Sequence, residues 1–404
     1  MESTRHVGFL ATASPMPLNP DTLLAAFATI PDPRRAASVV YPLSSLLAVL
    51  VSALLANQHS VLAIAEWAAR QSDAILVPLG LRAGQTPCQS TLQRLLVRLD
   101  AAAVSAALST ALAQAAPAPT GRGSQGIAID GKAQRGRLQY ATGGCPVHAL
   151  SALLHGTGIV LAHEPITAGD DKAEAELTVA PALVARLDWR GRVLTGDALF
   201  CQRDLCQQVL DAGGDYLLLV KDNQPSLLRD ITWLFAPASE REAPVPLLDQ
   251  RTARTVERSH GRTDDTRILT ATTDVVGYSD WPGLAQVFRV ERTWHADGRN
   301  QHVIHYGVTS LPPEVSDAER LLALKRAHWQ IENEVHYVKD VTLGEDRSLI
   351  HVGQGPVVMA MLRDAVISVV RVSGWRTIAS RLRYLADRPA EAVALVVQSL
   401  TTRA

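Results

Sequence analysis

One stretch of the sequence places three side chains that could act as acids, bases or ligands on a single helical stripe. His328, Glu332 and His336 are four residues apart within AHWQIENEVHYVKDVTLGED, residues 327–346, and residues at this spacing share one face of an α-helix. The stripe could be part of a zinc site, a charged solvent-facing surface, or one side of a larger active site. One ion cannot reach all three side chains, because they span about 12 Å of helix, and the HExxH zinc motif is absent.

Two aspartates follow segments with strand character. Asp130 ends the run GIAID and precedes Gly131, where we expect the chain to turn, and Asp197 follows RVLTG. Ligands collect at the carboxyl ends of strands in open α/β sheets, and carboxylate oxygens suit hard cations such as Mg²⁺ and Mn²⁺. With Glu332 from a helix beside the sheet, the aspartates could form a divalent-metal site. Each carboxylate taken alone could instead belong to an ordinary turn or a polar helix face.

The elements that must position these residues begin with a helical part and continue with an α/β part. Residues 1–25 form a loose tail, and residues 26–115 show helical periodicity with much Ala and Leu. On one short helix of this part, Arg94 and Arg98 could face DNA or only solvent. Residues 116–124 have the composition of a linker. Over residues 125–223, three strand-like runs precede alternating helices and strands, which predicts a mixed sheet with helices on its faces.

The rest of the chain is predicted to be a β-rich insertion followed by helices. Period-two patterns over residues 224–312 indicate antiparallel hairpins. Residues 313–404 resume with a long helix that carries Glu332, and Ser316 with Glu319 has the form of a capping box at its start. Arginines recur near the strand period in the insertion and could form either a basic strip or an ordinary charged face: Arg251, Arg254, Arg258 and Arg262.

The composition indicates a globular chain of two or three domains. The 404 residues are 47% hydrophobic and 20% charged with a formal net charge of -1, so DNA binding would need a local basic surface. Four cysteines without a CxxC pair favour a reduced, cytoplasmic protein. The most apolar run, Leu46 to Ala56, is shorter than the roughly 20 residues that span a bilayer, so we expect no membrane partner.

These blocks together resemble the DDE transposases of bacterial insertion sequences, most closely the branch of the H-repeat-associated proteins. AIDGK with Arg135 resembles the first aspartate block, and VLTGDALF with GGDYLLLVK resembles the second. The third block, RAHWQIENEVHY followed by ED, matches the branch at Arg326, His328, Trp329, Ile331, Glu332, Asn333 and His336. Tyr337 stands where the branch commonly has Trp. Of the wider Y-x2-R-x3-E-x6-K signature, only Glu332 and Lys339 match. The likeness covers residues from about 30 to about 400.

The resemblance implies a fold, a site and partners. It implies an α/β, ribonuclease-H-like mixed sheet with a β-rich insertion, preceded by a helical N-terminal domain that could bind DNA ends and followed by C-terminal helices. It implies a catalytic, metal-binding triad of Asp130, Asp197 and Glu332 that holds Mg²⁺, for which Mn²⁺ would substitute. It also implies a bacterial transposase that cuts and joins double-stranded DNA at element ends and targets, as a homodimer on paired ends.

Basic and imidazole side chains near the triad and in the insertion are candidate DNA contacts, and each could instead form an ordinary ion pair: Lys132, Arg135, Arg254, Arg258, Arg326, His328, His336 and Lys339. Trp329 is predicted to lie in the core, and Glu345 with Asp346 to form a solvated turn. Two other functions stay open. The chain could be a domesticated DNA-binding protein that no longer catalyses, or a metal-dependent nuclease of the same fold.

Overall fold

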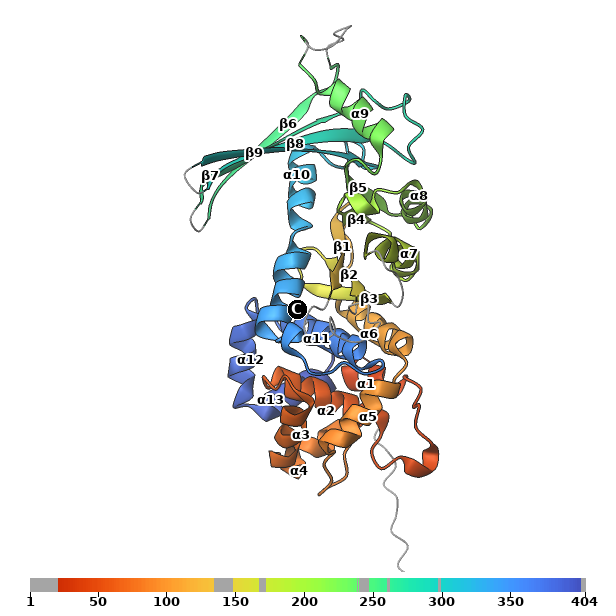
Figure 1. Ribbon diagram of the computed structural model, residues 1–404, viewed down its shortest axis with the longest axis vertical. Coiled ribbons are helices and arrows are strands. Elements are labelled where there is room, and N and C mark those ends of the chain that lie inside the picture. The colour runs from red at the N-terminus through yellow and green to blue at the C-terminus, as the bar shows by residue number, and fades with distance from the viewer. Residues whose placement is uncertain are drawn as a thin grey trace, which may run out of the picture.

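The computed structural model describes residues 21–133, 148–166, 172–237, 239, 247–259, 262–296 and 299–400. Helices from the N-terminal and C-terminal parts of the chain pack together at one end of the molecule, and long strands project at the other (Figure 1). A single mixed sheet runs between these two ends.

The nine strands of this sheet lie in the order β3-β2-β1-β4-β5-β9-β8-β7-β6. Antiparallel pairing joins β1 to β2 and β2 to β3, whereas β1 pairs with β4, and β4 with β5, in parallel. The strands are β1 (Gln125–Ala133), β2 (His148–Leu154), β3 (Ile159–Ile166), β4 (Arg192–Gly196) and β5 (Asp215–Val220). Three antiparallel strands followed by two parallel ones make the ribonuclease-H-like arrangement, so the predicted fold class is confirmed.

Crossover helices cover one face of the parallel strands. Parallel neighbours need a crossover connection, which is supplied by α7 (Lys172–Ala185) and α8 (Arg203–Asp211). These helices pack against each other beside the sheet (Figure 1). Every residue of β4 is buried, which explains why RVLTG reads as a short apolar run without alternation.

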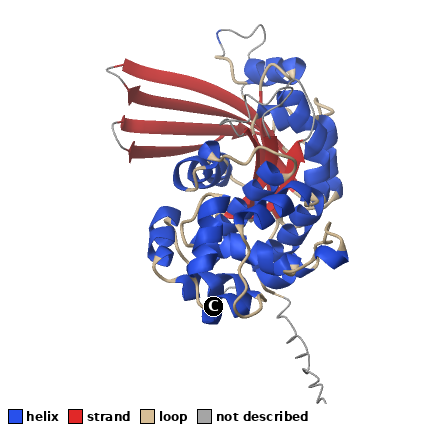
Figure 2. Cartoon of the chain, turned by 60° about the horizontal axis from the view of Figure 1, so that its bottom comes forward, coloured by secondary structure: helices blue, strands red, loops and turns tan. Residues whose placement is uncertain are grey.

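The insertion extends the same sheet. After α9 (Pro225–Leu234), which the sequence analysis did not anticipate, it forms β6 (Arg251–Ser259), β7 (Arg262–Thr272), β8 (Gln286–Ala296) and β9 (Arg299–Thr309). β9 pairs with β5, and Gly307 makes this junction possible, because a Cβ there would lie 2.2 Å from the Phe288 ring and 2.6 Å from the Leu218 carbonyl oxygen. Figure 2 shows the long strands of the insertion projecting beyond the helices.

The helices at both ends of the chain form one body. The N-terminal helices are α1 (Leu23–Ala28), α2 (Leu43–Leu55), α3 (Val61–Arg70), α4 (Asp73–Leu76), α5 (Gln89–Arg98) and α6 (Ala101–Ala115). The C-terminal helices are α11 (Gly355–Val372), α12 (Ile378–Ala386) and α13 (Pro389–Val397). α2 packs against α11 and α13, and α6 and α11 both pack against β3. α2 and α11 are buried along nearly their whole length, so each is a core helix of this body.

Within the described residues, no single helix has the length and apolar character to cross a membrane. The pair α5 and α6 meets that test only jointly, on length and composition, and is bent by 94° between its two helices.

A buried network of charges joins the segment after residue 337 to α11 and to β3. Lys339 Nζ lies 3.1 Å from Asp364 Oδ1 and 3.7 Å from Glu345 Oε2. Arg363 Nη1 lies 3.3 Å from Glu345 Oε2, and His163 Nδ1 donates to Asp364 Oδ2 at 2.7 Å. Burial alone would lower the pKa of Lys339, but Asp364 and Glu345 outweigh it and raise that pKa. The ammonium therefore stays charged inside the protein.

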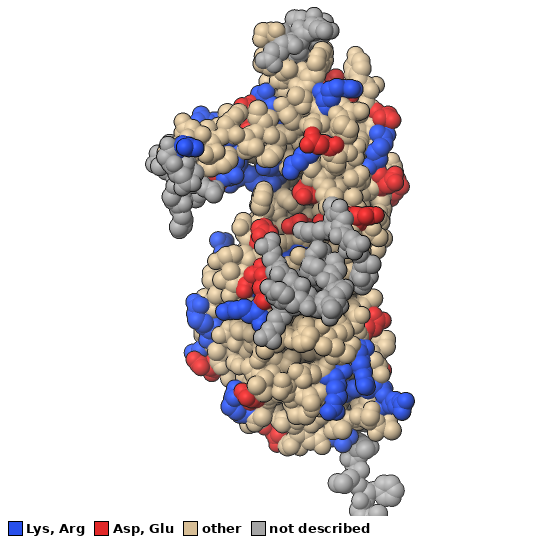
Figure 3. Space-filling view, in the orientation of Figure 1, with Lys and Arg blue, Asp and Glu red and all other residues tan. Residues whose placement is uncertain are grey.

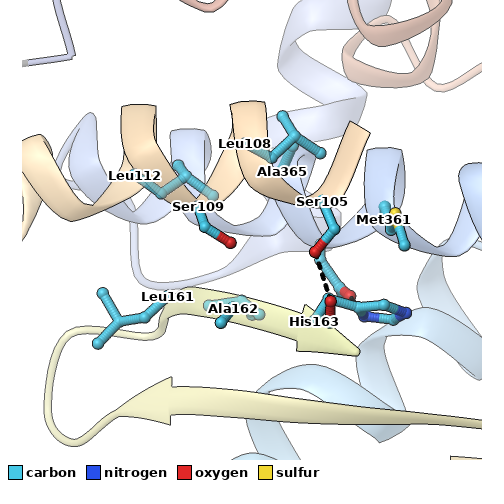
Figure 4. Close-up of a pocket in the computed structure, with 11 residues that line it drawn as sticks. Ser105, Leu108, Ser109, Leu112, Leu161, Ala162, His163, Met361 and Ala365 are labelled. Carbon is cyan, nitrogen blue, oxygen red and sulfur yellow. Dashed lines mark hydrogen bonds and ion pairs between the residues drawn. The ribbon is translucent and has the colours of Figure 1, made fainter. Parts of the chain in front are cut away.

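The same network reaches the N-terminal helices through β3. The Ser105 hydroxyl on α6 donates to the backbone carbonyl of His163 (Figure 4), while the His163 ring is bonded to Asp364 of α11. Arg186, which follows α7, donates to Ser105 Oγ at 2.9 Å and to Glu164 at 2.7 Å. Residues from α6, β3, α7 and α11 thus hold one another in place through polar contacts.

We expect Asp364→Asn to lower the free energy of unfolding by about 3 kcal/mol, because a buried cation that loses its partner is strongly destabilising. Equilibrium unfolding in urea measures this change. Asp387→Asn, at an exposed site after α12, removes the same charge and should change stability by less than about 0.5 kcal/mol. A loss no larger for Asp364→Asn than for this control would contradict the role given to the network.

The network should also make stability depend on pH. Burial opposes the charge of Asp364, but Lys339 and His163 lower the pKa of its carboxyl from 3.8 to about 2. A carboxyl whose pKa is lower in the folded state stabilises the fold at neutral pH and loses this contribution as the pH falls through about 4 to about 2. The stability difference between wild type and Asp364→Asn should therefore shrink as the pH of the urea titration is lowered. A difference that stays constant would show that Asp364 is not charged in the folded protein.

Candidate active site

The predicted long helix changes its winding before it reaches Glu332. α10 (Ala318–Ala327) begins at Asp317, whose side chain accepts from Arg320 N at 2.8 Å, so the predicted cap at Ser316 is one residue too early. The chain continues as two π-helical segments, η6 (Ile331–His336) and η7 (Val338–Thr342). π-helical turns are rare and concentrate at functional sites. Here the first of them carries both Glu332 and His336.

Three side chains from β1 and η6 form a compact donor cluster. Candidate ligand atoms of Asp130, Glu332 and His336 all lie within 4.8 Å of one another. His336 Nδ1 donates to Glu332 Oε2 at 2.9 Å and lies 3.5 Å from Asp130 Oδ2. The His336 side chain is 5% exposed, whereas that of Glu332 is 53% exposed. The glutamate carboxylate therefore reaches solvent while the imidazole lies beneath it.

Asp130 lies inside a strand. β1 continues to Ala133, and Gly131 is paired with Leu150 on β2, so the predicted turn after Asp130 is wrong. A Cβ on Gly131 would lie 2.0 Å from Glu176 Oε1 on α7. The glycine is thus explained by the close approach of a helix, because a residue without a side chain admits its neighbour. Asp130 gains a rigid position in the middle of the sheet.

Asp197 lies just past the end of the neighbouring strand β4, at the same level as Asp130. Ala128 is paired with Thr195 in parallel register, and two residues further along each chain come Asp130 and Asp197, on the same face because side chains alternate. Asp197 follows the last residue of β4 and its Oδ1 accepts from Leu199 N at 2.9 Å. The structure therefore brings Asp130 and Glu332 together, and the donor cluster contains His336 where the sequence analysis named Asp197.

His328 faces β4 and is buried beside the cluster. Its Nδ1 lies 3.5 Å from Thr195 Oγ1, which also lies 3.0 Å from His155 Nε2. Burial, with Lys325 and His336, lowers the pKa of His328 to about 4, and burial lowers that of His155 to about 3. Both rings are neutral at neutral pH, so the structure favours a packing role for His328 over the predicted DNA contact. The sequence analysis did not identify Thr195 or His155 as residues near the site. Thr195 could have been found, because it lies two residues before Asp197 and side chains at this spacing share one face of a strand.

Several predicted DNA contacts lie in ion pairs within the protein. Lys132 Nζ is 2.7 Å from both carboxylate oxygens of Asp340, and Lys339 is 2% exposed within the buried network. Arg326 is bonded to Glu257 on β6. For these three residues the structure favours the ion-pair alternative. His336, bonded to Glu332, is likewise turned into the site.

The arginines of the insertion do not share one face where the structure describes them. Arg254 is exposed, whereas Arg251 is bonded to Asp249 at 2.6 Å. Residues three apart on a strand point to opposite faces, so for this pair the structure favours the alternative of an ordinary charged face over a basic strip. The side chains of Arg258 and Arg262, and all of Arg135, lie outside the described residues.

Two further predictions are wrong because of how η6 and the loop after η7 pack. Ile331, Val335 and Val338 turn into the core, which leaves Trp329 on the opposite side and 59% exposed. Glu345 is buried, since Lys339 and Arg363 bind it, and does not lie in a solvated turn.

A basic surface lies above the cluster, where the projecting strands pass over α10 (Figure 3). Arg267 and Arg292 both bind Asp265, at 2.8 Å and 2.7 Å. Burial, together with these two arginines, lowers the pKa of Lys325 on α10 to about 8. Arg267 also binds Glu257 at 3.0 Å, and Arg326 binds the same carboxylate. The four cationic side chains outnumber the two carboxylates in this corner, which favours an anionic partner near the site.

Comparisons with known proteins match both halves of the chain. Residues 121–367 match the family model described as Transposase DDE domain, and residues 24–111 match the one described as DDE_Tnp_1-associated. A relative named as transposase YncI of Escherichia coli O157:H7 is 28% identical over 366 residues, which cover 87% of each chain. An uncharacterized protein in the dhlA 3′ region of Xanthobacter autotrophicus is 30% identical over 278 residues, 68% of this chain and 89% of that one.

Two further similarities complete the comparison. A relative named as H repeat-associated transposase YhhI of Escherichia coli strain K12 is 27% identical over 252 residues, 60% of this chain and 63% of its own. A piggyBac transposase synaptic complex with hairpin DNA aligns with 92% of this chain and 77% of its own, at 11% identity and a TM-score of 0.40. Because the transposase model spans residues 121–367, more than half of the sequence, the chain belongs to the DDE transposases, in the branch of the H repeat-associated proteins.

Proposed function

We propose that this DNA transposase cuts and joins the ends of a bacterial insertion sequence by two-metal phosphoryl transfer, with Asp130, Asp197 and Glu332 as its catalytic carboxylates. The observation that carries the proposal is the donor cluster: two carboxylates far apart in the sequence meet within 4.8 Å, together with His336. Its substrates are double-stranded element ends and target DNA in the bacterial cytoplasm, and it acts as a homodimer on paired ends, without a membrane.

The donor set fits Mg²⁺, with Mn²⁺ as its substitute. Mg²⁺ takes one or two carboxylates and keeps several waters, and Glu332 is exposed enough to share an ion with solvent. Among the described residues, Asp197 Oδ2 has no protein partner, because capping uses only Oδ1. When bound, two such ions activate the attacking oxygen and stabilise the leaving oxygen of an in-line displacement.

The protein's own contribution is to hold its carboxylates in position. Asp130 is fixed by β1, which has neighbours on both sides. The Lys132–Asp340 ion pair ties this strand to η7, a few residues beyond Glu332. His336 donates to Glu332 and so limits the orientation of its carboxylate. Hydrogen bonds of this kind to metal-binding carboxylates tune both affinity and geometry, so we assign His336 a positioning role.

Glu332→Gln should reduce strand cleavage by at least about 100-fold, more than the loss of an outer hydrogen-bond partner costs, because an amide cannot replace the anionic donor. The assay uses a labelled duplex that carries the flanking ends of the gene, with Mg²⁺ or Mn²⁺. Glu334→Gln is the matched control: it removes the same charge from the same segment, where Glu334 lies 3.7 Å from Arg371, and should leave cleavage within about 3-fold of wild type.

Three other results of this assay would contradict parts of the proposal. Cleavage that persists in Glu332→Gln would mean that Glu332 is not a catalytic carboxylate. Binding of the ends without cleavage by the wild type would favour a domesticated DNA-binding protein. Cleavage that is never followed by joining to a target would favour a nuclease.

His336→Ala should lower cleavage by about 10- to 100-fold at limiting metal, because Glu332 loses the donor that orients it. The half-saturating Mg²⁺ concentration should rise, and excess metal should restore part of the rate. A titration of the cleavage rate against Mg²⁺ measures both effects, with His336→Gln as the variant that retains a donor. A variant that is slow at every metal concentration, with an unchanged midpoint, would point to a role for His336 in folding alone.

A further inference from the structure

A groove of ≈ 800 Å³ lies between α3, α5 and the loop that follows η7. Its walls come from residues 59–62, from α5, from Gly344 and from residues 347–352. None of the donor-cluster residues lines it. The groove therefore lies between the N-terminal helices and the loop after η7. It is a surface separate from the candidate active site.

The groove is lined by basic groups that nothing in the described structure neutralises. Arg94, Arg98 and Arg347 are exposed, and none of their guanidinium groups has a hydrogen-bond or ion-pair partner among the described residues. The imidazoles of His59 and His351 lie with them, and the described lining contains no carboxylate. Over the whole chain, basic and acidic residues are nearly equal in number, 39 and 40. Such a local excess of unpaired cations favours an anion.

The same groove exposes aliphatic side chains beside the arginines. Leu349 is 62% exposed and Val352 is 54% exposed, and Leu62 on α3 and Val97 on α5 are also exposed. Apolar walls with a guanidinium edge fit a nucleotide, which presents a flat base and a phosphate. Nucleic-acid grooves that accept unpaired strands combine a basic track for the phosphates with side chains that contact the base faces, a contact that aliphatic side chains would make here. Stacked base pairs of a duplex keep their faces hidden, so only unpaired bases could reach these walls.

His59 adds an acceptor to the groove. Its Nε2 lies 3.0 Å from Asn57 Oδ1, which can only accept, so Nε2 carries the proton. Burial, then Arg363 and Arg347, lower the pKa of His59, which keeps the ring neutral. Nδ1 is then a lone-pair acceptor, buried and without a partner among the described residues.

The groove is fixed to the active-site segment by the buried network. Glu345, which follows the wall residue Gly344, is held by Lys339 and Arg363, and Lys339 belongs to the same π-helical stretch as Glu332. A strand bound in the groove would therefore keep a defined position relative to the catalytic carboxylates.

We propose that this groove binds an unpaired DNA strand beside the cleaved end, with phosphates on Arg94, Arg98 and Arg347 and bases against the aliphatic walls. The inference rests on the proposed function and adds to it the place where a strand lies once it has separated from its complement. The interaction is not sequence-specific, because aliphatic walls and guanidinium groups contact features common to all nucleotides.

The test compares binding of a fluorescent single strand of about 20 nucleotides, long enough for one such site, with binding of the matching duplex. Anisotropy is measured in EDTA, so that no cleavage occurs. Arg94→Gln/Arg347→Gln, one residue from each wall, should weaken strand binding at least 10-fold. It should also reduce the slope of log K against log salt by about 1.4, for two lost phosphate contacts. Duplex binding should change less than about 3-fold.

The matched control is Arg376→Gln/Arg383→Gln. Both arginines are exposed, lie outside the groove, and have no side-chain partner among the described residues. The control should bind the strand like the wild type. Leu349→Ser should weaken strand binding about 3- to 10-fold through lost apolar contact, whereas Leu248→Ser, at an exposed leucine elsewhere, should not.

The outcomes separate this inference from the proposed function. Unchanged strand binding by Arg94→Gln/Arg347→Gln, in a protein whose wild type cuts element ends, would overturn the groove assignment and leave the function standing. An equal loss of duplex and strand binding would overturn the assignment to an unpaired strand. A wild type that neither binds nor cuts DNA would overturn both.

Discussion

The ammonium of Lys339 is the constraint on which the arrangement of the site depends. It is buried between Asp364 of α11 and Glu345, and a buried charge without partners is too costly to persist. Asp364 in turn accepts from His163 on β3. These contacts fix η7, α11 and the sheet relative to one another. Glu332 lies on the same stretch of chain as Lys339, so its position relative to the sheet is fixed as well. The network thus fixes the position of Glu332 without touching it.

The insertion and the central sheet supply the other half of the geometry. β9 pairs with β5, which covers an edge that would otherwise expose unpaired backbone groups. α10 packs against β6 and β7 and then returns toward β1. The chain therefore leaves the central sheet after Asp197, forms the long insertion, and returns with Glu332 to the side of β1. Lys132 of β1 binds Asp340 where the returning segment meets this strand.

Pairing, more than net charge, decides which surfaces of this chain can attract DNA. The net charge is -1, yet the arginines of the groove have no partner among the described residues, whereas Arg267 and Arg292 are partly neutralised by Asp265. Solvent-exposed guanidinium groups that are not paired retain their attraction for phosphate. The net charge of the whole chain does not show that the arginines of one surface are unpaired while those of another are partly neutralised.

The sequence by itself determined most of the order of strands and helices, the family, and the choice of Asp130 and Glu332 as candidate site residues, because hydrophobic periodicity and short motifs are local properties. Only the tertiary structure decided the environment of each charged residue. Lys132 and Asp340 are 208 residues apart, and Lys339 and Asp364 are 25 apart, so no local pattern shows that they pair. For the same reason Gly131 reads as a turn until α7 is seen beside it, and Trp329 reads as core until the π-helical winding turns it outward.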